Sequence, residues 1–375
     1  MARRLVALLA LVWLFCPWQT AAQSAPQPTA HPVRLAVAGL VHGHVDRFVR
    51  LALARPGIEL VGIFESDAEL RQKAPERLKV PADIVFADLA TMLDRTKPDL
   101  VAAFTTTGDH PMVVDAAASR HVHVMMEKPL AVSVAAARAI ARAASRGGIR
   151  VIVNYETTWY PSHAAIWRLV KEEHAAGDIR KMVAMDGHSG PKAIKVQPEF
   201  FSWLVDPLKN GGGALFDFGC YGANLMTWLM DDARPISVIA LTQHLQPDTY
   251  RSVDDEATIL VEYPKAQGII QASWNWPVGR KDLEVYGERG YAIATGGSSL
   301  RLRLADDKDE RRPALDPRAD TERDEIAYLM AVVRGATPSG PSSLANNVVV
   351  TEILAAARDS ARTGRRVTLA SAPEK

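Results

Sequence analysis

The fold of this chain is decided by its residues 33–54, which read VRLAVAGLVHGHVDRFVRLALA. An apolar run, Val33–Ala38, ends at Gly39, and Val45–Ala54 then shows the apolar spacing of a helix. The same alternation of a short apolar run and a helical pattern continues to about residue 153. Strands that helices cover on both faces are apolar throughout, so this alternation predicts a doubly wound parallel sheet, an α/β fold.

The remaining elements of this half follow the same pattern. The further strands are expected at Ile58–Phe64, Leu100–Phe104, Val122–Met126 and Val151–Val153, and the further helices at Ala68–Leu78, His110–Ser119 and Val132–Ser145. After about Asn154, strand-like runs follow one another without intervening helices, which favours an α+β domain with a largely antiparallel open sheet. These runs are Ile236–Gln243, Ala257–Tyr263, Gly268–Trp274, Leu283–Tyr286 and Leu300–Leu304. Helices are expected at His163–Glu173, at Glu322–Arg334 and at Ser343–Ala361, and a further helix that follows the Gly-rich entry Gly211-Gly212-Gly213 is expected to end near Met230.

The first 22 residues have the composition of a secretory signal peptide. Met1–Arg4 is basic, Leu5–Pro17 is apolar, and Thr20-Ala21-Ala22 offers small residues for cleavage. The apolar stretch is too short for a spanning helix, and an uncleaved anchor is the alternative. Arg3-Arg4 permits the twin-arginine route as well as general secretion. We expect a periplasmic or secreted protein without stable membrane association once processed, with residues 23–32 as a flexible leader.

Composition limits the class of partner. The 375 residues include 44 Lys+Arg against 43 Asp+Glu and are 48% hydrophobic, which predicts two globular domains. A nucleic-acid partner is not expected, because neutralising phosphates requires a clear basic excess. Removing residues 1–22 deletes two arginines and no acidic residue, leaving 42 basic against 43 acidic residues. It also removes Cys16, so Cys220 stands alone and disulfides are not expected.

The turn after the first strand has the form of a dinucleotide-binding turn. A glycine there lets the backbone turn tightly, so that the next helix N-terminus faces a pyrophosphate. The full pattern has glycines at positions 39, 41 and 44, whereas this chain has Gly39, Val41, Gly43 and His44. Glu65 ends the second strand, where an acid accepts hydrogen bonds from a ribose 2′-OH and repels a 2′-phosphate. NAD is therefore the expected cofactor and NADP the alternative; an ordinary strand-to-helix turn stays open.

Two further groups carry chemistry. Lys128, in Glu127-Lys128-Pro129, follows the strand Val122–Met126, which places it at the carboxyl edge of the sheet where ligands bind. Asp217, Tyr221 and Asn224 are spaced i, i+4 and i+7, so we expect them on one helical face. A polar stripe in an apolar helix either lines a cavity or forms a buried hydrogen-bonded network.

Metal and aromatic signals are less specific. The pairs His42/His44 and His121/His123 each lack two further ligands at a recognisable spacing, so no metal site is expected. Seven aromatic residues could stack on sugar rings or belong to the core: Trp159, Tyr160, Phe200, Phe201, Trp203, Trp274 and Trp276.

With these residues in view, the chain resembles the Gfo/Idh/MocA family, that of glucose–fructose oxidoreductase and inositol dehydrogenase. The resemblance rests on residues 123–130 (HVMMEKPL), on 211–217 (GGGALFD) leading to Tyr221, and on 360–367 (SARTGRRV). It implies a Rossmann dinucleotide domain over residues 33–153 and a substrate and oligomerisation domain over 154–375. The last helices would pack back on the first domain, and the open sheet would form the contact of a dimer or tetramer.

The resemblance also implies residue roles. Thr105, Thr107 and His110 match a cofactor-contacting loop, and Lys128 matches a lysine that contacts cofactor and substrate. Asp217 and Tyr221 match an Asp-x-x-x-His/Tyr element, in which Tyr221 is the acid/base whose phenol pKa the Lys128 cation is expected to lower. The residues expected to hold the cofactor are Gly39, Val41, His42, Gly43, Glu65, Thr105, Thr107, His110, Glu127 and Lys128; those expected to contact substrate are Asn154, Trp159, Tyr160 and Asn224.

Three functions follow as hypotheses. The first is an exported NAD(P)-dependent oxidoreductase that transfers a hydride to or from a hydroxyl or ketone of a sugar, glycoside or polyol. The second is an NAD-dependent glycoside hydrolase on the same fold. The third, suggested by Val41 and His44, is a non-catalytic sugar-binding protein on a decayed scaffold.

Overall fold

The computed structural model describes residues 31–369, and its first part is a six-stranded parallel sheet. The strand order is β3-β2-β1-β4-β5-β6, so the order reverses between β1 and β4. The strands are β1 (Val33–Ala38), β2 (Ile58–Phe64), β3 (Val85–Phe86), β4 (Leu100–Ala103), β5 (His123–Glu127) and β6 (Val151–Asn154). The predicted doubly wound sheet is confirmed, and its reversal point is where such sheets bind ligands.

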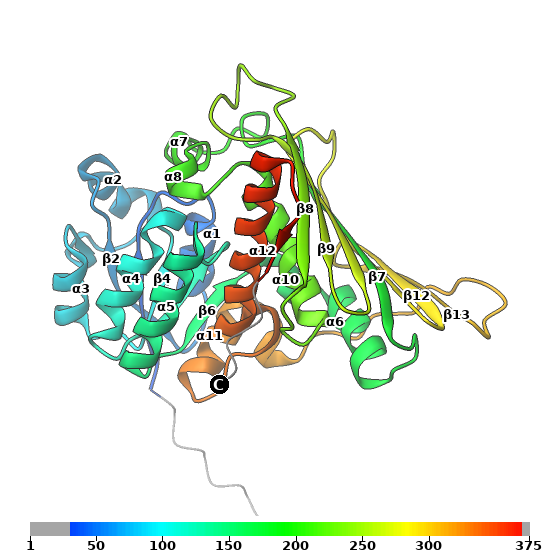
Figure 1. The fold of residues 1–375 in the computed structure, drawn as a ribbon. Helices are drawn as coiled ribbons and strands as arrows, with labels where there is room; N and C mark the ends of the chain where they lie inside the picture. Colours follow the sequence, from blue (N-terminus) through cyan, green and yellow to red (C-terminus); the bar gives the residue numbers. More distant parts are fainter. Residues whose placement is uncertain (1–30, 370–375) are drawn as a thin grey trace, which may run out of the picture. The chain divides into compact units, whose positions relative to one another are not determined.

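Helices cover both faces of this sheet (Figure 1). In β1, Leu35 and Val37 pack on one side and Ala36 and Ala38 on the other, which explains the unbroken apolar run. Helices α1 (Val45–Leu53), α2 (Ala68–Leu78) and α11 (Glu325–Val333) share the first core, and α3 (Leu89–Thr96), α4 (His110–Ala118) and α5 (Val134–Gly147) share the second. The strand β3 and the helix α3 were not among the predicted elements.

The second part is an eight-stranded mixed sheet of order β13-β12-β11-β7-β10-β9-β8-β14. Its strands are β7 (Ile179–Gly187), β8 (Ser237–Gln243), β9 (Glu256–Glu262), β10 (Gln267–Ser273), β11 (Arg280–Gly287), β12 (Gly290–Thr295), β13 (Ser299–Leu304) and β14 (Val367–Thr368). Only β7 and β10 pair in parallel, so the predicted largely antiparallel sheet is confirmed. The strands β7, β12 and β14 were not predicted.

Several helices of the second part lie between the two sheets or pack beside them. They are α6 (Pro161–Trp167), α7 (Pro198–Leu204), α8 (Pro207–Asn210), α9 (Ala214–Asp217), α10 (Gly219–Leu229) and α12 (Leu344–Thr363), and a π-helical turn, Arg168–Glu172, extends α6. Helix α12 packs against α5, α10 and β8, and Figure 1 shows it between the two sheets. The single helix expected to run to near Met230 is interrupted at Phe218, between α9 and α10.

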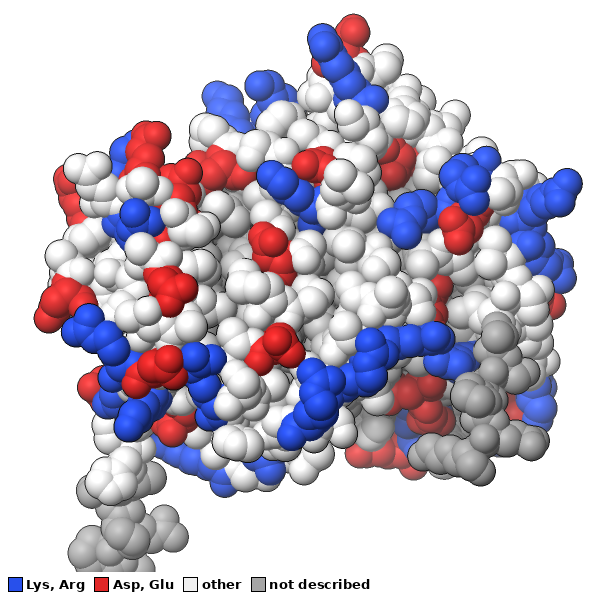
Figure 2. All heavy atoms as spheres, turned by 60° about the vertical axis from the view of Figure 1, so that its left-hand side comes forward, with Lys and Arg blue, Asp and Glu red and all other residues white. Residues whose placement is uncertain are grey.

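Among residues 31–369, no helix combines the length and apolar character needed to cross a membrane. Figure 2 shows acidic and basic side chains interspersed over the face that the first sheet's helices present. The expected signal peptide, residues 1–22, lies outside the described residues, and so does the leader except for His31 and Pro32.

Candidate active site

The turn between β1 and α1 is held tightly by its neighbours. Gly39 has φ +88°, and a Cβ there would lie 2.7 Å from Thr105 Cγ2, so only glycine fits. The His42 N–H donates to the Phe104 carbonyl at 3.1 Å. Trp203 of α7 donates from Nε1 to the Val41 carbonyl at 3.1 Å, so a helix of the second part lies directly on the turn.

Glu65 lies beneath this turn. Its side chain is 3% exposed and accepts hydrogen bonds from the Leu40 N–H at 2.6 Å and the Asp67 N–H at 2.8 Å. The carboxylate therefore shapes the turn, which sequence reasoning did not predict. A carboxylate has about four lone-pair positions, so acceptor capacity is left for a ribose hydroxyl.

The helix that follows the turn fits a dinucleotide diphosphate. Helix α1 begins after His44, whose side chain makes no capping hydrogen bond, so the first N–H groups of a nine-residue helix have no side-chain cap. Such N–H groups and the helix dipole attract anions. Together with the tight turn at Gly39, this donor set suits NAD.

Lys128 and Asp217 form a buried ion pair across the two parts of the chain. Lys128 Nζ lies 2.5 Å from Asp217 Oδ1, and the two side chains are 8% and 10% exposed. Trp274 Nε1 donates to Asp217 Oδ2 at 2.9 Å. Burial alone would lower the pKa of Lys128 and raise that of Asp217, but their mutual attraction reverses both directions, so both stay charged.

Tyr221 lies beside this pair, between two cations. Its ring centre is 5.1 Å from Lys128 Nζ and 4.6 Å from Lys281 Nζ. The expected lowering of its pKa is wrong: burial raises the pKa of the Tyr221 phenol well above its usual value, and the nearby Glu156 carboxylate raises it further. Both lysines are themselves paired with carboxylates, Lys128 with Asp217 and Lys281 with Glu156.

These side chains line a cavity that sequence reasoning described only in part. The cavity has a volume of about 260 Å³, and its polar lining residues are His42, His44, Lys128, His188, Gln197, Asp217, Tyr221 and Lys281. A neighbouring cavity of about 580 Å³ shares His188, Phe218 and Lys281 with it. His188 and Lys281 were missed because one follows the unpredicted strand β7 and the other lies on β11, where a lysine carries no local signal of a site.

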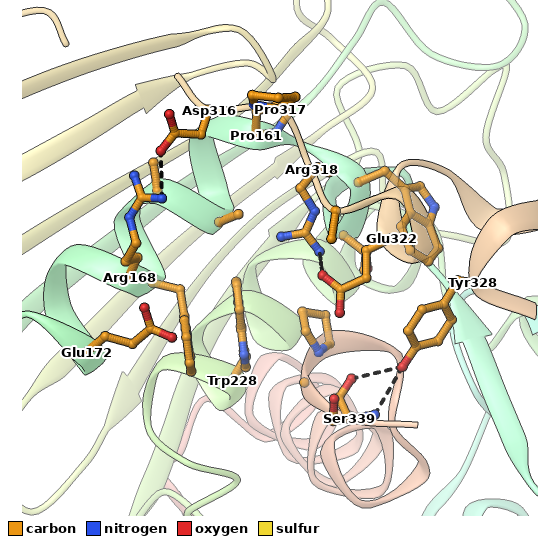
Figure 3. A pocket seen from close by; sticks show the side chains of 18 residues that line it. Pro161, Arg168, Glu172, Trp228, Asp316, Pro317, Arg318, Glu322, Tyr328 and Ser339 are labelled. Carbon is orange, nitrogen blue, oxygen red and sulfur yellow. Dashed lines mark hydrogen bonds and ion pairs between the residues drawn. The ribbon is translucent and has the colours of Figure 1, made fainter. Parts of the chain in front are cut away.

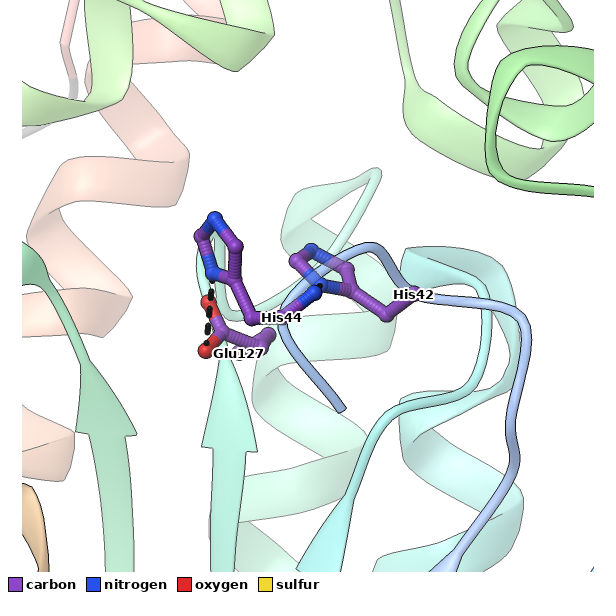
Figure 4. A group of neighbouring side chains, drawn as sticks. All are labelled: His42, His44 and Glu127. Atoms are coloured by element: carbon purple, nitrogen blue, oxygen red, sulfur yellow. Dashed lines mark hydrogen bonds and ion pairs between the residues drawn. The ribbon is translucent and has the colours of Figure 1, made fainter. Parts of the chain in front are cut away.

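The structure brings His42, His44 and Glu127 together (Figure 4). His44 Nδ1 lies 3.2 Å from Glu127 Oε1, and one ligand atom from each residue lies within 4.8 Å of the others. Burial lowers the pKa of His42 to about 3, which keeps this imidazole neutral. No metal was expected because the histidine pairs were considered without Glu127, which the fold supplies from β5.

The loop after β4 contributes buried polar residues. Thr105 and Thr107 are 6% and 1% exposed; Thr105 lies against Gly39, and Thr107 begins a short 3-10 helix, Thr107–Asp109. His110 Nδ1 lies 3.0 Å from the Leu130 carbonyl and is 1% exposed, so it ties this loop to the segment after Lys128. Thr105 therefore lies at the reversal point of the sheet, between the ends of β1 and β4.

Asn154 and Trp159 extend the Glu127 group. Asn154 donates from Nδ2 to Glu127 Oε1 at 3.0 Å and accepts from Trp159 Nε1 at 3.1 Å. Both line a cavity of about 310 Å³ with His44 and Glu127. Tyr160 lines the 580 Å³ cavity, where its hydroxyl donates to Glu156 Oε1 at 2.5 Å.

Asn224 does not reach any of these cavities. It is fully buried and donates from Nδ2 to the Pro341 carbonyl and to Asn346 Oδ1, both at 2.8 Å. The expected common face with Asp217 fails because the helix is interrupted at Phe218. Asn224 thus belongs to the buried network that was the alternative, and its assignment to the substrate is corrected.

Comparison with known proteins supports one family. A model described as "Oxidoreductase family, NAD-binding Rossmann fold" matches residues 33–155, and a GFO/IDH/MocA C-terminal domain model matches 163–293, together more than half of the chain. D-apiose dehydrogenase of Paraburkholderia graminis is 29% identical over 116 residues, 31% of this chain and 30% of that protein. The 1,5-anhydro-D-fructose reductase of Ensifer adhaerens is 26% identical over 147 residues, 39% and 42% of the two chains. This chain thus spans less than half the length of these curated relatives.

Solved structures match over most of their length. An inositol dehydrogenase homolog of Azotobacter vinelandii in complex with NAD⁺ has a TM-score of 0.78 at 20% identity, covering 91% of this chain and 98% of that one. Aldose–aldose oxidoreductase of Caulobacter crescentus has a TM-score of 0.76 at 20% identity, covering 90% and 100%. At this identity the likeness shows the fold. The chain therefore belongs to the Gfo/Idh/MocA family of oxidoreductases, and its residues 33–155 are an NAD-binding Rossmann domain.

Proposed function

We propose that the protein is an NAD-dependent oxidoreductase that interconverts a hydroxyl and a ketone on a sugar, glycoside or polyol. The observation that carries this proposal is the buried Lys128–Asp217 ion pair, which lies with Tyr221 against one cavity. The names of the relatives support it, because they include a dehydrogenase and a reductase of sugars.

The chain's own residues would hold the cofactor at the reversal point of the first sheet. The tight turn at Gly39 and the uncapped N-terminus of α1 would hold the diphosphate, with Glu65 and Thr105 on either side. Bound NAD⁺ would accept the hydride in oxidation of the substrate, and bound NADH would supply it in reduction. The protein's contribution is position and proton transfer.

Lys128 and Tyr221 would bind the substrate oxygen and transfer its proton. The Lys128 ammonium donates a hydrogen bond to that oxygen, while Asp217 orients the ammonium through its 2.5 Å contact. The Tyr221 phenol gives its proton to the ketone oxygen in reduction and takes it from the hydroxyl in oxidation. Burial raises the pKa of this phenol, so the phenol carries a proton at neutral pH.

Purified protein tests this proposal. Bound nucleotide is first identified by absorbance and mass spectrometry, and sugars, keto-sugars and polyols are then screened for oxidation or reduction of the nicotinamide. Lys128→Met and Tyr221→Phe should retain NAD but lose turnover. The matched control is Tyr155→Phe, because the Tyr155 ring packs edge-on to Tyr221 at 5.5 Å while its hydroxyl has no hydrogen-bond partner among residues 31–369.

The results separate the alternatives. Near-wild-type turnover in Lys128→Met or Tyr221→Phe contradicts the proposed roles. Release of an aglycone without accumulation of NADH indicates the hydrolase instead. Protein that binds sugar but neither contains nor binds NAD indicates the non-catalytic alternative.

We also propose that the protein is exported and forms a homo-oligomer. Export is supported by the composition of residues 1–22, and a mass measurement of the native protein together with cell fractionation tests it. Free NAD is scarce outside the cytoplasm, so an exported enzyme should keep its cofactor bound and recycle it with a second substrate. Oligomerisation is supported by Ile239 and Leu241, which are 38% and 65% exposed on the open side of β8, and light scattering tests it.

A further inference from the structure

Lys281 lies at the junction of two cavities of the candidate active site, and the reaction proposed above gives it no role. It projects from β11 and lines both the cavity of about 260 Å³ and the cavity of about 580 Å³. Its Nζ atom lies 4.6 Å from the ring centre of Tyr221, compared with 5.1 Å for Lys128 Nζ. Because its side chain is 19% exposed and lines both cavities, a ligand in either cavity can reach the ammonium group.

The Lys281 ammonium group keeps hydrogen-bond donors that no neighbour uses. An ammonium group has three N–H donors. Within residues 31–369, Glu156 Oε2 is the acceptor of the one hydrogen bond that Lys281 Nζ donates. Asp186 lies opposite Lys281 in the pairing of β7 with β11, but neither of its carboxyl oxygens makes a hydrogen bond to any described residue. Burial raises the pKa of Asp186 well above its usual value, which favours its neutral form. Two donors of Lys281 are therefore left for a ligand.

Glu156 holds the Lys281 side chain in this position. It begins the short 3-10 helix Glu156–Trp159 that follows β6, and its Oε1 accepts a hydrogen bond from the Tyr160 hydroxyl at 2.5 Å. The Glu156 side chain is 52% exposed, so its ion pair with Lys281 is in contact with water and contributes little to stability. Removing the Glu156 charge should therefore leave the ammonium group within reach of a ligand.

The charges of the two cavities indicate which group Lys281 binds. Besides histidines, the charged lining residues are three cations and three carboxylates, which pair as Lys128–Asp217, Arg280–Asp282 and Lys281–Glu156. No cation is in excess, so a phosphate or carboxylate group on the ligand is disfavoured. A neutral hydroxyl can accept one of the unused N–H donors of Lys281 without displacing Glu156.

We propose that Lys281 determines specificity by donating a hydrogen bond to a hydroxyl of the substrate other than the reacting one. Lys128 binds the reacting oxygen and Lys281 binds a second oxygen of the same molecule. The site therefore selects substrates with two or more hydroxyls over simple secondary alcohols. This inference rests on the proposed oxidoreductase function and assigns its preference for polyhydroxylated substrates to one side chain.

A separate cavity of about 530 Å³ supplies a matched control. Its wall includes the stacked rings of Trp167 and Trp228, and Lys281 does not line it. Figure 3 shows the ion pair of Arg168 with Asp316 there, with Arg168 Nη1 2.8 Å from Asp316 Oδ2 and with side chains 44% and 71% exposed. Arg168→Met thus removes a cation that is paired with an exposed carboxylate, as Lys281 is, but outside the active site.

Three alcohols that share a six-membered carbon ring test the inference: cyclohexanol, trans-1,2-cyclohexanediol and myo-inositol. Reduction of NAD⁺ gives kcat and KM for wild type, Lys281→Met, Glu156→Gln and Arg168→Met. In wild type, we expect KM for the diol and for myo-inositol to be about tenfold or more below KM for cyclohexanol, because a hydrogen bond from a charged group contributes this much. Lys281→Met should raise the two lower KM values about tenfold and leave KM for cyclohexanol unchanged. Glu156→Gln and Arg168→Met should keep the difference between the alcohols.

Other results overturn the inference. Equal KM values of wild type for the three alcohols overturn it while the proposed oxidoreductase function stands, and so does a difference that persists in Lys281→Met. An equal loss of the difference in Lys281→Met and Glu156→Gln also overturns it, because the ion pair and not the ammonium group would then be responsible. Wild-type protein that contains NAD but oxidises none of the three alcohols contradicts the proposed function for polyols, and the inference falls with it.

Discussion

Replacing Lys128 by methionine tests the buried ion pair on which the proposed active site depends. Methionine keeps most of the apolar stem but leaves the Asp217 carboxylate buried without its cation. Removing one partner of a buried pair costs about 3–5 kcal/mol of unfolding free energy. Because Trp274 Nε1 still donates to Asp217 Oδ2 at 2.9 Å, we expect the lower end of that range, about 3 kcal/mol.

A double-mutant cycle isolates the pair. Asp217→Asn alone should cost a similar amount, because it leaves the Lys128 ammonium buried. The double variant should lose less than the sum of the two, with a coupling energy of about 2 kcal/mol. Urea unfolding followed by circular dichroism at neutral pH measures all four proteins. The control is Lys171→Met: Lys171 Nζ also lies 2.5 Å from a carboxylate, that of Asp231, but these side chains are 23% and 72% exposed, so its loss should stay below about 1 kcal/mol.

The pH dependence gives a second readout. In Lys128→Met, burial raises the pKa of Asp217 above its unfolded value, about 3.9, so the penalty is present at neutral pH. The loss of unfolding free energy in Lys128→Met should shrink as the pH falls through the raised pKa of Asp217 in the folded state. It should vanish below the pKa of Asp217 in the unfolded chain. A Lys128→Met protein within about 1 kcal/mol of wild type at neutral pH, or additive single substitutions, would refute the reasoning.

Three further predictions concern single positions. Asn224→Ala removes two hydrogen bonds of a fully buried network, so it should cost about 1–3 kcal/mol in urea unfolding while KM for the substrate stays unchanged. Gly39→Ala places a Cβ 2.7 Å from Thr105 in the β4–α4 loop at φ +88°, so it should weaken NAD binding in calorimetry and destabilise the fold by about 1–3 kcal/mol. The control is Gly148→Ala, at φ +60° with nothing within 4 Å of the added Cβ, which should leave the affinity for NAD unchanged. Burial lowers the pKa of His163 to about 4, below its unfolded value of about 6.5. Between these two pH values the unfolded chain binds more protons than the folded one. The unfolding free energy should therefore fall as the pH drops through this range, by about 3 kcal/mol in total. His163→Phe should flatten this slope, and an unchanged slope would contradict the assignment.

The elements predicted from the sequence were those that carry their own periodicity. The run Val33–Ala38 matches β1, and Ile58–Phe64 matches β2, because a strand covered on both faces is apolar along its whole length. Strand β7 was missed because Arg180 and Lys181 interrupt its apolar pattern, although Met182 and Ala184 face the core. Strand β3 has two residues, too few for any pattern.

The candidate site likewise has features that short sequence motifs predict and features that depend on contacts between distant residues. Lys128 and Asp217 each lie in a short motif of neighbouring residues, 123–130 and 211–217, so the sequence alone identified both residues through the family resemblance. The contact between Lys128 and Asp217 joins residues 89 positions apart. The approach of Lys281 to Tyr221 joins two other elements that are distant in the chain, β11 and α10. The sign of the Tyr221 pKa shift depended on burial and on the approach of the Glu156 carboxylate, neither of which any local pattern encodes.

The sequence by itself determined the doubly wound sheet, the turn at Gly39 and the family, because each rests on residues that are neighbours in the chain. Only the tertiary structure decided that Asn224 belongs to a buried network, that burial raises the pKa of Tyr221 and that Trp167 and Trp228 line a separate cavity. These properties arise from desolvation and from contacts between distant segments. Their free energies depend on which groups the fold brings together, and that information appears only once the chain has packed.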